Sequence, residues 1–182
     1  LEFWENTLLV TAVMNTQPNE DSDFIPLTID FRESYYAWWK IWWWQYQKRE
    51  WKPSDSAILN ARLTDRPIRP MFPSWMVNDV VITITPLSID KENSIWVFSI
   101  IWSSLAIMLA WIPFEGPVWA VRIWYKDWEF IVNPTLKEVE EWTLDLVIAW
   151  TKDTITMVEC WSKEIETEIL MKAFELAQKE IK

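Results

Sequence analysis

Apolar and polar positions alternate along several short stretches in the first half of the chain. Residues 7–14 and 24–31 alternate and are rich in β-branched side chains, which predicts two strands. The polar stretch 15–22 between them contains Asn, Pro, Asp and Ser, and it predicts a loop. Residues 80–87 predict a third strand, with Pro86 near its end.

The second half predicts two hairpins. The first joins residues 118–125 to 129–132, and the second joins residues 143–149 to 154–159. A polar stretch of helical character, residues 136–141, lies between them.

Three longer helices are also predicted. Residues 57–63 follow Ser54 and Asp55, either of which can serve as the N-cap, and Pro67 and Pro70 end this helix. Residues 95–109 are apolar nearly all round, which indicates a helix packed on more than one side and the most buried element of the fold. We expect Ile100, Leu105 and Leu109 to be shielded from solvent there.

The last predicted helix covers residues 162–182. It carries one apolar stripe, formed by Ile165, Ile169, Leu170, Ala173, Phe174 and Ala177. Hairpins with interspersed helices and no regular βαβ alternation predict an α+β fold. No repeat or linker divides the chain, so we expect residues 1–182 to form a single domain.

The chain contains 17 tryptophans and one glycine, Gly116. Average glycine usage of about 7% would give about 13 glycines in a chain of this length. Trp128 stands between two predicted strands where Asp-Gly is the preferred turn pair, and Trp142 follows a helical stretch where a C′ glycine is common. Trp150 also falls in a predicted turn.

We hypothesise that the tryptophans stand at glycine positions, because UGA codons have been read as Trp in a lineage that decodes them as Gly. Tryptophans encoded by UGG would contradict this. The alternative is a genuinely Trp-rich surface that stacks on RNA or lies at a membrane interface, which turn and cap positions disfavour. We expect exposed indoles at Trp128 and Trp142, and crowded ones at Trp102 and Trp111.

Composition narrows the possible chemistry. The net charge is −10, so any nucleic-acid contact must be local. The chain has no histidine, which excludes Ser-His-Asp, Cys-His and His-zinc sites within it. Its one cysteine, Cys160, cannot form an internal disulfide, and no signal-peptide pattern is present, which favours the cytoplasm. The apolar run 95–114 is interrupted by three serines and Pro113, so no membrane span is predicted.

Several motifs resemble one family when glycine is read for tryptophan. They are FIPLTID at 24–30, YYA at 35–37, KREWKPS at 48–54, RLTDRPIRP at 62–70, IPFEGP at 112–117, NPT at 133–135 and LDLV at 144–147. Together they resemble the first RNase PH-type core domain of bacterial polynucleotide phosphorylases over nearly the whole chain. DRPIRP is the most specific of them.

The resemblance implies a phosphate-dependent 3′-to-5′ exoribonuclease that assembles as a homotrimer around a central pore, takes single-stranded RNA, and associates with RNA-degradation proteins. It also implies an N-terminally truncated fragment, because family members have a further strand or two before residue 1. Their second core domain and their KH and OB-fold modules are likewise expected outside this fragment. The Mg²⁺ and phosphate sites and the catalytic aspartate belong to that second core domain. No catalytic or metal-binding residue is therefore expected in this fragment.

The resemblance places an RNA-gripping pore loop at Tyr46, Lys48 and Arg49, where an aromatic can stack on a base and two cations can meet phosphates. The alternative for the two cations is an ordinary solvated loop. Family members often carry two phenylalanines here, so the charges are the firmer part of the match.

Three further arginines, Arg62, Arg66 and Arg69, could contact RNA, but structural ion pairing with Asp65 or a neighbouring subunit is favoured. Three carboxylates could suggest a paired acid–base site, and solvated or capping roles are favoured for them. They are Asp30, Glu33 and Asp145.

A noncatalytic ring subunit of an exosome-like assembly has the same expected fold and remains an alternative. A second core domain encoded downstream would favour the phosphorylase. A free-standing RNase PH fits DRPIRP and IPFEGP less well.

Overall fold

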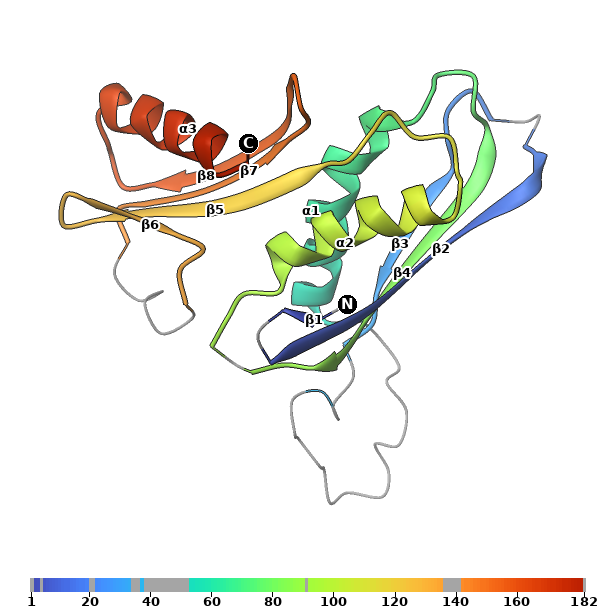
Figure 1. The fold of residues 1–182 in the computed structure, drawn as a ribbon, viewed down its shortest axis with the longest axis horizontal. Helices are drawn as coiled ribbons and strands as arrows, with labels where there is room; N and C mark the ends of the chain where they lie inside the picture. The colour runs from blue at the N-terminus through green and yellow to red at the C-terminus, as the bar shows by residue number, and fades with distance from the viewer. Residues whose placement is uncertain are drawn as a thin grey trace, which may run out of the picture.

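The computed structural model describes residues 2–3, 5–19, 22–33, 37, 53–90, 92–135 and 142–181. They form two four-stranded sheets and three α-helices, which confirms the α+β prediction. Figure 1 shows the layers in order: one sheet, helices α1 and α2, the second sheet, and helix α3.

The first sheet has the strand order β1-β2-β4-β3. Its strands are β1 (Glu2–Phe3), β2 (Asn6–Pro18), β3 (Leu27–Phe31) and β4 (Asn78–Ser88). β2 and β4 are antiparallel, whereas β3 is an edge strand that runs parallel to β4. Buried and more exposed residues alternate along β4, and the buried ones, Val80, Ile82 and Ile84, point into the core.

The second sheet is an antiparallel set with the order β6-β5-β7-β8. Its strands are β5 (Trp119–Lys126), β6 (Glu129–Val132), β7 (Leu144–Trp150) and β8 (Ile155–Ser162). Both predicted hairpins are therefore confirmed. β5 and β7 are buried on both faces, because alternate residues face α1 and α2 on one side and α3 on the other.

Helices α1 (Asp55–Ile68) and α2 (Trp96–Leu109) fill the space between the sheets. Ser54 is the N-cap of α1, since its hydroxyl accepts a hydrogen bond from the Ala57 amide at 3.0 Å. A short 3₁₀ turn, η2 (Arg69–Met71), follows. α2 belongs to two cores: Phe98 and Ile107 pack against the first sheet, and Val97 and Ile100 pack against the second.

Helix α3 (Thr167–Ile181) covers the outer face of the second sheet. Ala173 and Ala177 are fully buried beneath it. The predicted stripe is confirmed, since its other members pack against the same core: Ile165, Ile169, Leu170 and Phe174.

Five of the predicted boundaries were wrong. β8 continues to Ser162, where pairing with Leu144 holds the chain extended, so α3 begins at Thr167. α1 continues through Pro67 to Ile68. A proline in the last turn removes only one hydrogen bond near the end of the helix, so it does not stop the helix there. β2 extends to Pro18, and β3 begins at Leu27 rather than residue 24.

The prediction that α2 is the most buried element was wrong, because β7, which is covered on both faces, is buried at six of its seven residues, whereas α2 is buried at seven of its 14. Ile100 is fully buried and Leu105 is half-buried, but Leu109 is 75% exposed because the last turn of α2 extends past both cores.

Trp111 occupies a glycine position at the end of α2. The Ile112 amide donates to the Ile107 carbonyl and the Trp111 amide donates to the Met108 carbonyl, which is the hydrogen-bond pattern of a Schellman motif. This motif needs a left-handed C′ residue, and Trp111 has φ 58°. Its side chain is 92% exposed, so the prediction that this indole is crowded was wrong, because the left-handed turn directs it out of the core.

Trp128 occupies a second glycine position, in the turn between β5 and β6. Asp127 and Trp128 have φ 47° and 71°, as a type I′ turn requires at both central residues. The Trp128 indole is 86% exposed, as predicted.

The other tryptophans named in the predictions lie outside left-handed turns. Trp142 is half-buried beneath Lys163, whose Nζ lies 5.2 Å from its ring centroid, so the prediction of an indole turned to solvent was wrong. Trp102 is half-buried against Phe98, and Trp150 is the last residue of β7 rather than a turn residue. The crowded indole is Trp124, which is 1% exposed and whose Nε1 lacks a hydrogen-bond partner among the described residues.

We expect Trp111→Gly and Trp128→Gly each to stabilise the chain by about 1 kcal/mol, the cost of a left-handed backbone with a β-carbon. This corresponds to a rise in Tm of about 2–4 °C at this size. The measurement is thermal and urea unfolding followed by circular dichroism. Trp111→Ala and Trp128→Ala are the matched controls, because alanine keeps the β-carbon while removing the indole. An equal gain from alanine would show that indole exposure, not backbone strain, is the cause.

Candidate functional site

Arg69 joins the end of α1 to the edge of the first sheet. Its guanidinium holds both carboxylate oxygens of Asp65, at 3.0 and 2.7 Å. The same group donates to the backbone carbonyls of Ile25 and Leu27, each at 3.1 Å. All of these partners are structural, and they leave Arg69 little capacity for an RNA phosphate.

The other two arginines of α1 face different surroundings. Arg66 reaches Glu159 on β8 at 3.3 Å, so it links α1 to the second sheet. Arg62 lies beside β3 and is exposed, and none of the described residues forms an ion pair with it. Among the described residues, Arg62 is therefore the arginine of this group that has no ion-pair partner.

The three candidate carboxylates are each engaged separately. Asp30 pairs with Arg32 at 2.7 Å on the surface. Glu33 accepts hydrogen bonds from the hydroxyls of Ser54 and Ser56 at the N-terminus of α1. Asp145 pairs with a buried arginine of the neighbouring strand. No paired acid–base site is formed by these three residues.

That arginine, Arg122, was not singled out from the sequence. Its Nε and Nη2 donate to the two carboxylate oxygens of Asp145 at 2.8 and 2.7 Å, and both side chains are under 8% exposed. The guanidinium lies 5.2 Å from the ring centroids of Trp96 and Trp124. A charged residue at an inward position of an apolar strand, with Asp145 on the next hairpin, was the available signal. The pair clamps β5 to β7 beside the start of α2.

Cys160 is a poor candidate nucleophile. Partial burial, and then the negative charge of Asp145, raise the pKa of its thiol above the ordinary value. Less thiolate is therefore present at neutral pH than in a free cysteine.

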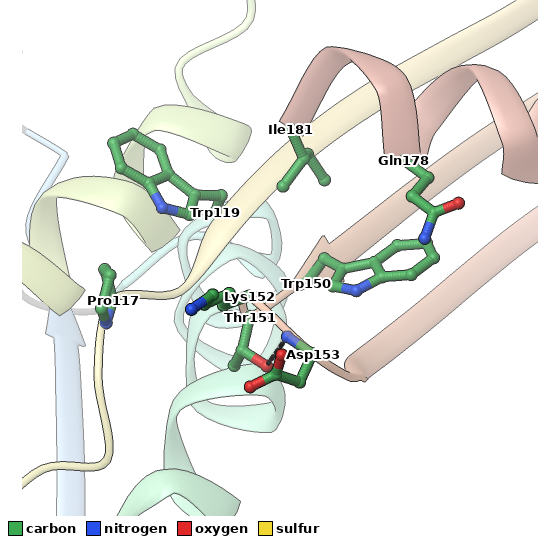
Figure 2. A pocket seen from close by; sticks show the side chains of 8 residues that line it. All are labelled: Pro117, Trp119, Trp150, Thr151, Lys152, Asp153, Gln178 and Ile181. Carbon is green, nitrogen blue, oxygen red and sulfur yellow. Dashed lines mark hydrogen bonds between the residues drawn. The ribbon is translucent and has the colours of Figure 1, made fainter.

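A surface cavity of about 520 Å³ lies where the β7–β8 turn meets the C-terminal end of α3 (Figure 2). Trp119 and Trp150, which are cross-strand partners, form two of its walls, and Lys152, Asp153 and Gln178 contribute polar groups. Glycine at the two tryptophan positions would remove those walls. The cavity thus depends on the two residues whose identity is in question, and we assign no ligand to it.

The predicted RNA-binding residues Tyr46, Lys48 and Arg49 lie outside the described residues, as does the predicted helical stretch 136–141. Among the described residues, no helix has the length and apolar character needed to cross a membrane.

Two family models match successive parts of the chain. Residues 1–113 match the first domain of the 3′ exoribonuclease family, of RNase PH type, and residues 116–180 match its second domain. The chain belongs to the 3′ exoribonuclease family. The boundary between the two matches falls after α2, where the chain passes from the first sheet and its helices to the second sheet.

Relatives within this family are similar over the whole chain. The polyribonucleotide nucleotidyltransferase of Brachyspira hyodysenteriae is 45% identical over 181 residues, which is 100% of this chain and 25% of the relative. The enzyme of the same name from Thermus thermophilus is 44% identical over 181 residues, again 100% of this chain and 25% of the relative. The chain thus spans about a quarter of the length of these relatives. The predicted polynucleotide phosphorylase resemblance is confirmed.

A solved structure confirms the RNase PH-like fold. A chain from the Archaeoglobus fulgidus exosome with RNA bound to the active site superimposes with a TM-score of 0.72 and 14% identity. The match covers 99% of this chain and 78% of that chain.

The described residues of this family member do not fit a Mg²⁺ site. No group of three or more Asp, Glu, Cys or His side chains comes together in it. The candidate carboxylates have arginine or serine partners, as described above. We therefore derive no catalytic step from these residues.

Asp90 organises the loop before α2. It accepts hydrogen bonds from the amides of Glu92 and Asn93 and from the side chains of Asn93 and Asn6, while the Asn6 amide oxygen accepts from the Asp90 amide at 3.0 Å. Burial opposes ionisation, but these hydrogen bonds outweigh it and lower the pKa of Asp90 below its ordinary value.

We expect Asp145→Ala to lower the free energy of unfolding by about 3–5 kcal/mol, because it leaves the Arg122 charge buried without a counterion. The double variant Arg122→Met with Asp145→Leu should recover most of this loss. The matched control is Arg32→Ala, which breaks the exposed pair with Asp30 and should cost less than about 1 kcal/mol. Urea denaturation measures all three. A small loss in Asp145→Ala would contradict a structural role for the clamp.

The Asp90 network gives a pH-dependent stability. Because its pKa is lowered in the folded state, its contribution is complete above the ordinary aspartate value and is lost as pH falls through the lowered value. Asn6→Ala removes one donor, so the variant should lose less stability than the original chain when the pH falls below about 4. Unfolding free energies across this range provide the measurement. Asn78→Ala is the control, because the Asn78 side chain bonds to the Asn15 carbonyl rather than to a carboxylate. It should change the unfolding free energy by the same amount at every pH.

Proposed function

We propose that this chain is a core domain of a phosphate-dependent 3′-to-5′ exoribonuclease, a polyribonucleotide nucleotidyltransferase that degrades RNA to nucleoside diphosphates. The observation that carries the proposal is the identity of 45% across the full chain to an enzyme of that name. We also propose that residues 1–182 act as one domain, formed by the two matched units around α1 and α2.

The proposed reaction is phosphorolysis. An oxygen of inorganic phosphate attacks the phosphorus of the last phosphodiester, the bond to the 3′ oxygen breaks, and a nucleoside diphosphate leaves an RNA shortened by one residue. We place Mg²⁺ and the reacting phosphate in parts of the protein beyond these 182 residues.

We assign RNA contact and ring architecture to this domain. Lys48 and Arg49 would meet backbone phosphates and Tyr46 would stack on a base. Arg62 is a further candidate, whereas Arg66 and Arg69 are engaged in ion pairs. A homotrimer with a central pore, a cytoplasmic location and contacts with RNA-degradation proteins complete the proposal. The fold shared with an exosome chain supports the ring.

A noncatalytic ring subunit of an exosome-like assembly is the second candidate. The shared fold supports this candidate as much as it supports the enzyme. The sequence identity favours the enzyme, because it is 45% to the nucleotidyltransferase and 14% to the exosome chain.

The test compares the complete gene product with residues 1–182 alone. With uniformly labelled RNA, phosphate and Mg²⁺, the complete protein should release labelled nucleoside diphosphates, and the isolated chain should release none. Nucleoside diphosphate release by the isolated chain would contradict our division of roles, and an inactive complete protein would favour the ring subunit. In the complete protein, Lys48→Glu with Arg49→Glu should lower RNA affinity and reduce its salt dependence by a slope of about 1.4. Lys172→Glu on α3 is the control and should change neither.

A further inference from the structure

A groove of about 360 Å³ runs between the edge strand β3 and helix α1. All five residues of β3 line one side of it. Residues of α1 spaced three or four apart line the other, with Ala57, Ile58 and Ala61 forming an apolar wall and Arg62 beside them. Ile58 is 47% exposed, so this wall is open to solvent.

The backbone of β3 presents hydrogen-bonding groups to this groove. The Val80 amide donates to the Pro26 carbonyl and the Arg32 amide donates to the Ile84 carbonyl, which fixes the phase of the parallel ladder. In that phase Thr28 and Asp30 direct their amides and carbonyls towards β4. The amide and carbonyl of Ile29 therefore point away from β4, to the edge of the sheet at which no other described strand pairs.

Most charged side chains that line the groove are paired with an opposite charge. Asp30 is neutralised by Arg32, and Asp65 is neutralised by Arg69. Arg69 also closes one end of the edge by holding the carbonyls of Ile25 and Leu27. Arg62 is the lining cation to which no described residue supplies a counterion. As far as the described residues go, the groove thus offers one positive charge without a counterion, an apolar wall and a strand position without a pairing strand.

We propose that this groove binds an extended, acidic peptide segment of a partner protein by strand addition to β3. The peptide backbone pairs with Ile29, alternate side chains lie on the wall of α1, and an acidic side chain meets Arg62. An RNA strand fits less well, because it has no alternating amide and carbonyl groups and its repeated phosphates would meet only Arg62 among the described cations that lack a counterion. The proposal does not depend on phosphorolytic activity.

The probe is a library of random eight-residue peptides displayed on phage and selected against the complete gene product that contains these residues. We expect enriched sequences with an acidic residue among alternating β-branched residues. Synthetic peptides made from them should bind Arg62→Glu about tenfold more weakly, as expected when an attractive charge pair becomes repulsive. Lys172→Glu carries the same charge change on α3 and should bind them with unchanged affinity.

Two measurements test the backbone contact. Ile29→Pro removes the amide that faces the groove and leaves the β3–β4 ladder intact, so binding should be lost while circular dichroism is preserved. In the original chain, hydrogen exchange at the Ile29 amide should slow when peptide is bound, and this readout holds even if the proline variant does not fold.

Failure to enrich any sequence over a surface without the chain would overturn the proposal. So would selected peptides that bind Arg62→Glu with undiminished affinity, or an Ile29 amide whose exchange is unchanged by bound peptide. If a twelve-residue oligoadenylate binds the groove in an Arg62-dependent manner while no peptide does, the site belongs to RNA and strand addition is wrong.

Discussion

The fold depends on a helix that is buried on both sides. α2 packs against the first sheet through Phe98 and Ile107 and against the second through Val97 and Ile100, so neither sheet has a complete core without it. The faces of α2 that meet the two sheets are shielded from water. Two of its buried serines have partners, since Ser99 bonds to Thr64 of α1 and Ser104 accepts from the Val118 amide at the start of the second sheet. The third, Ser103, has a buried hydroxyl with no hydrogen-bond partner among the described residues. Because serine side chains are small, they also let the helix approach both neighbours closely.

The Arg122–Asp145 clamp extends the same arrangement. It lies on the face of the second sheet that meets α2, and Trp96 from the first turn of that helix covers the guanidinium. A buried ion pair contributes little to stability when compared with well-packed apolar residues, but breaking one is costly. The clamp therefore selects one pairing of β5 with β7 over slipped alternatives, in which Arg122 would face the α3 side.

The sequence was most informative where periodicity alone decides the structure. The all-round apolar pattern of α2, the stripe of α3 and the alternation of the hairpin strands all led to the correct elements. The sequence was least informative where a contact with a residue far along the chain decides the local structure. Ser162 stays extended because it pairs with Leu144, and Leu109 is exposed because neither core reaches the end of α2. The Arg69 contacts with Ile25 and Leu27 join residues more than 40 positions apart, so no local pattern could reveal them. The candidate RNA residues came from family motifs rather than from physical pattern.

Arg69 also limits how strongly the edge of the first sheet can hold another chain. Open strand edges recruit other chains into growing aggregates, and native proteins block them with charge and cover. Because the guanidinium occupies the carbonyls before Ile29, an added strand gains few backbone bonds before it reaches the closed end. A contact of that kind dissociates quickly. The edge is thus suited to a partner that is exchanged repeatedly during the life of the protein, and poorly suited to a permanent subunit or to a fibril.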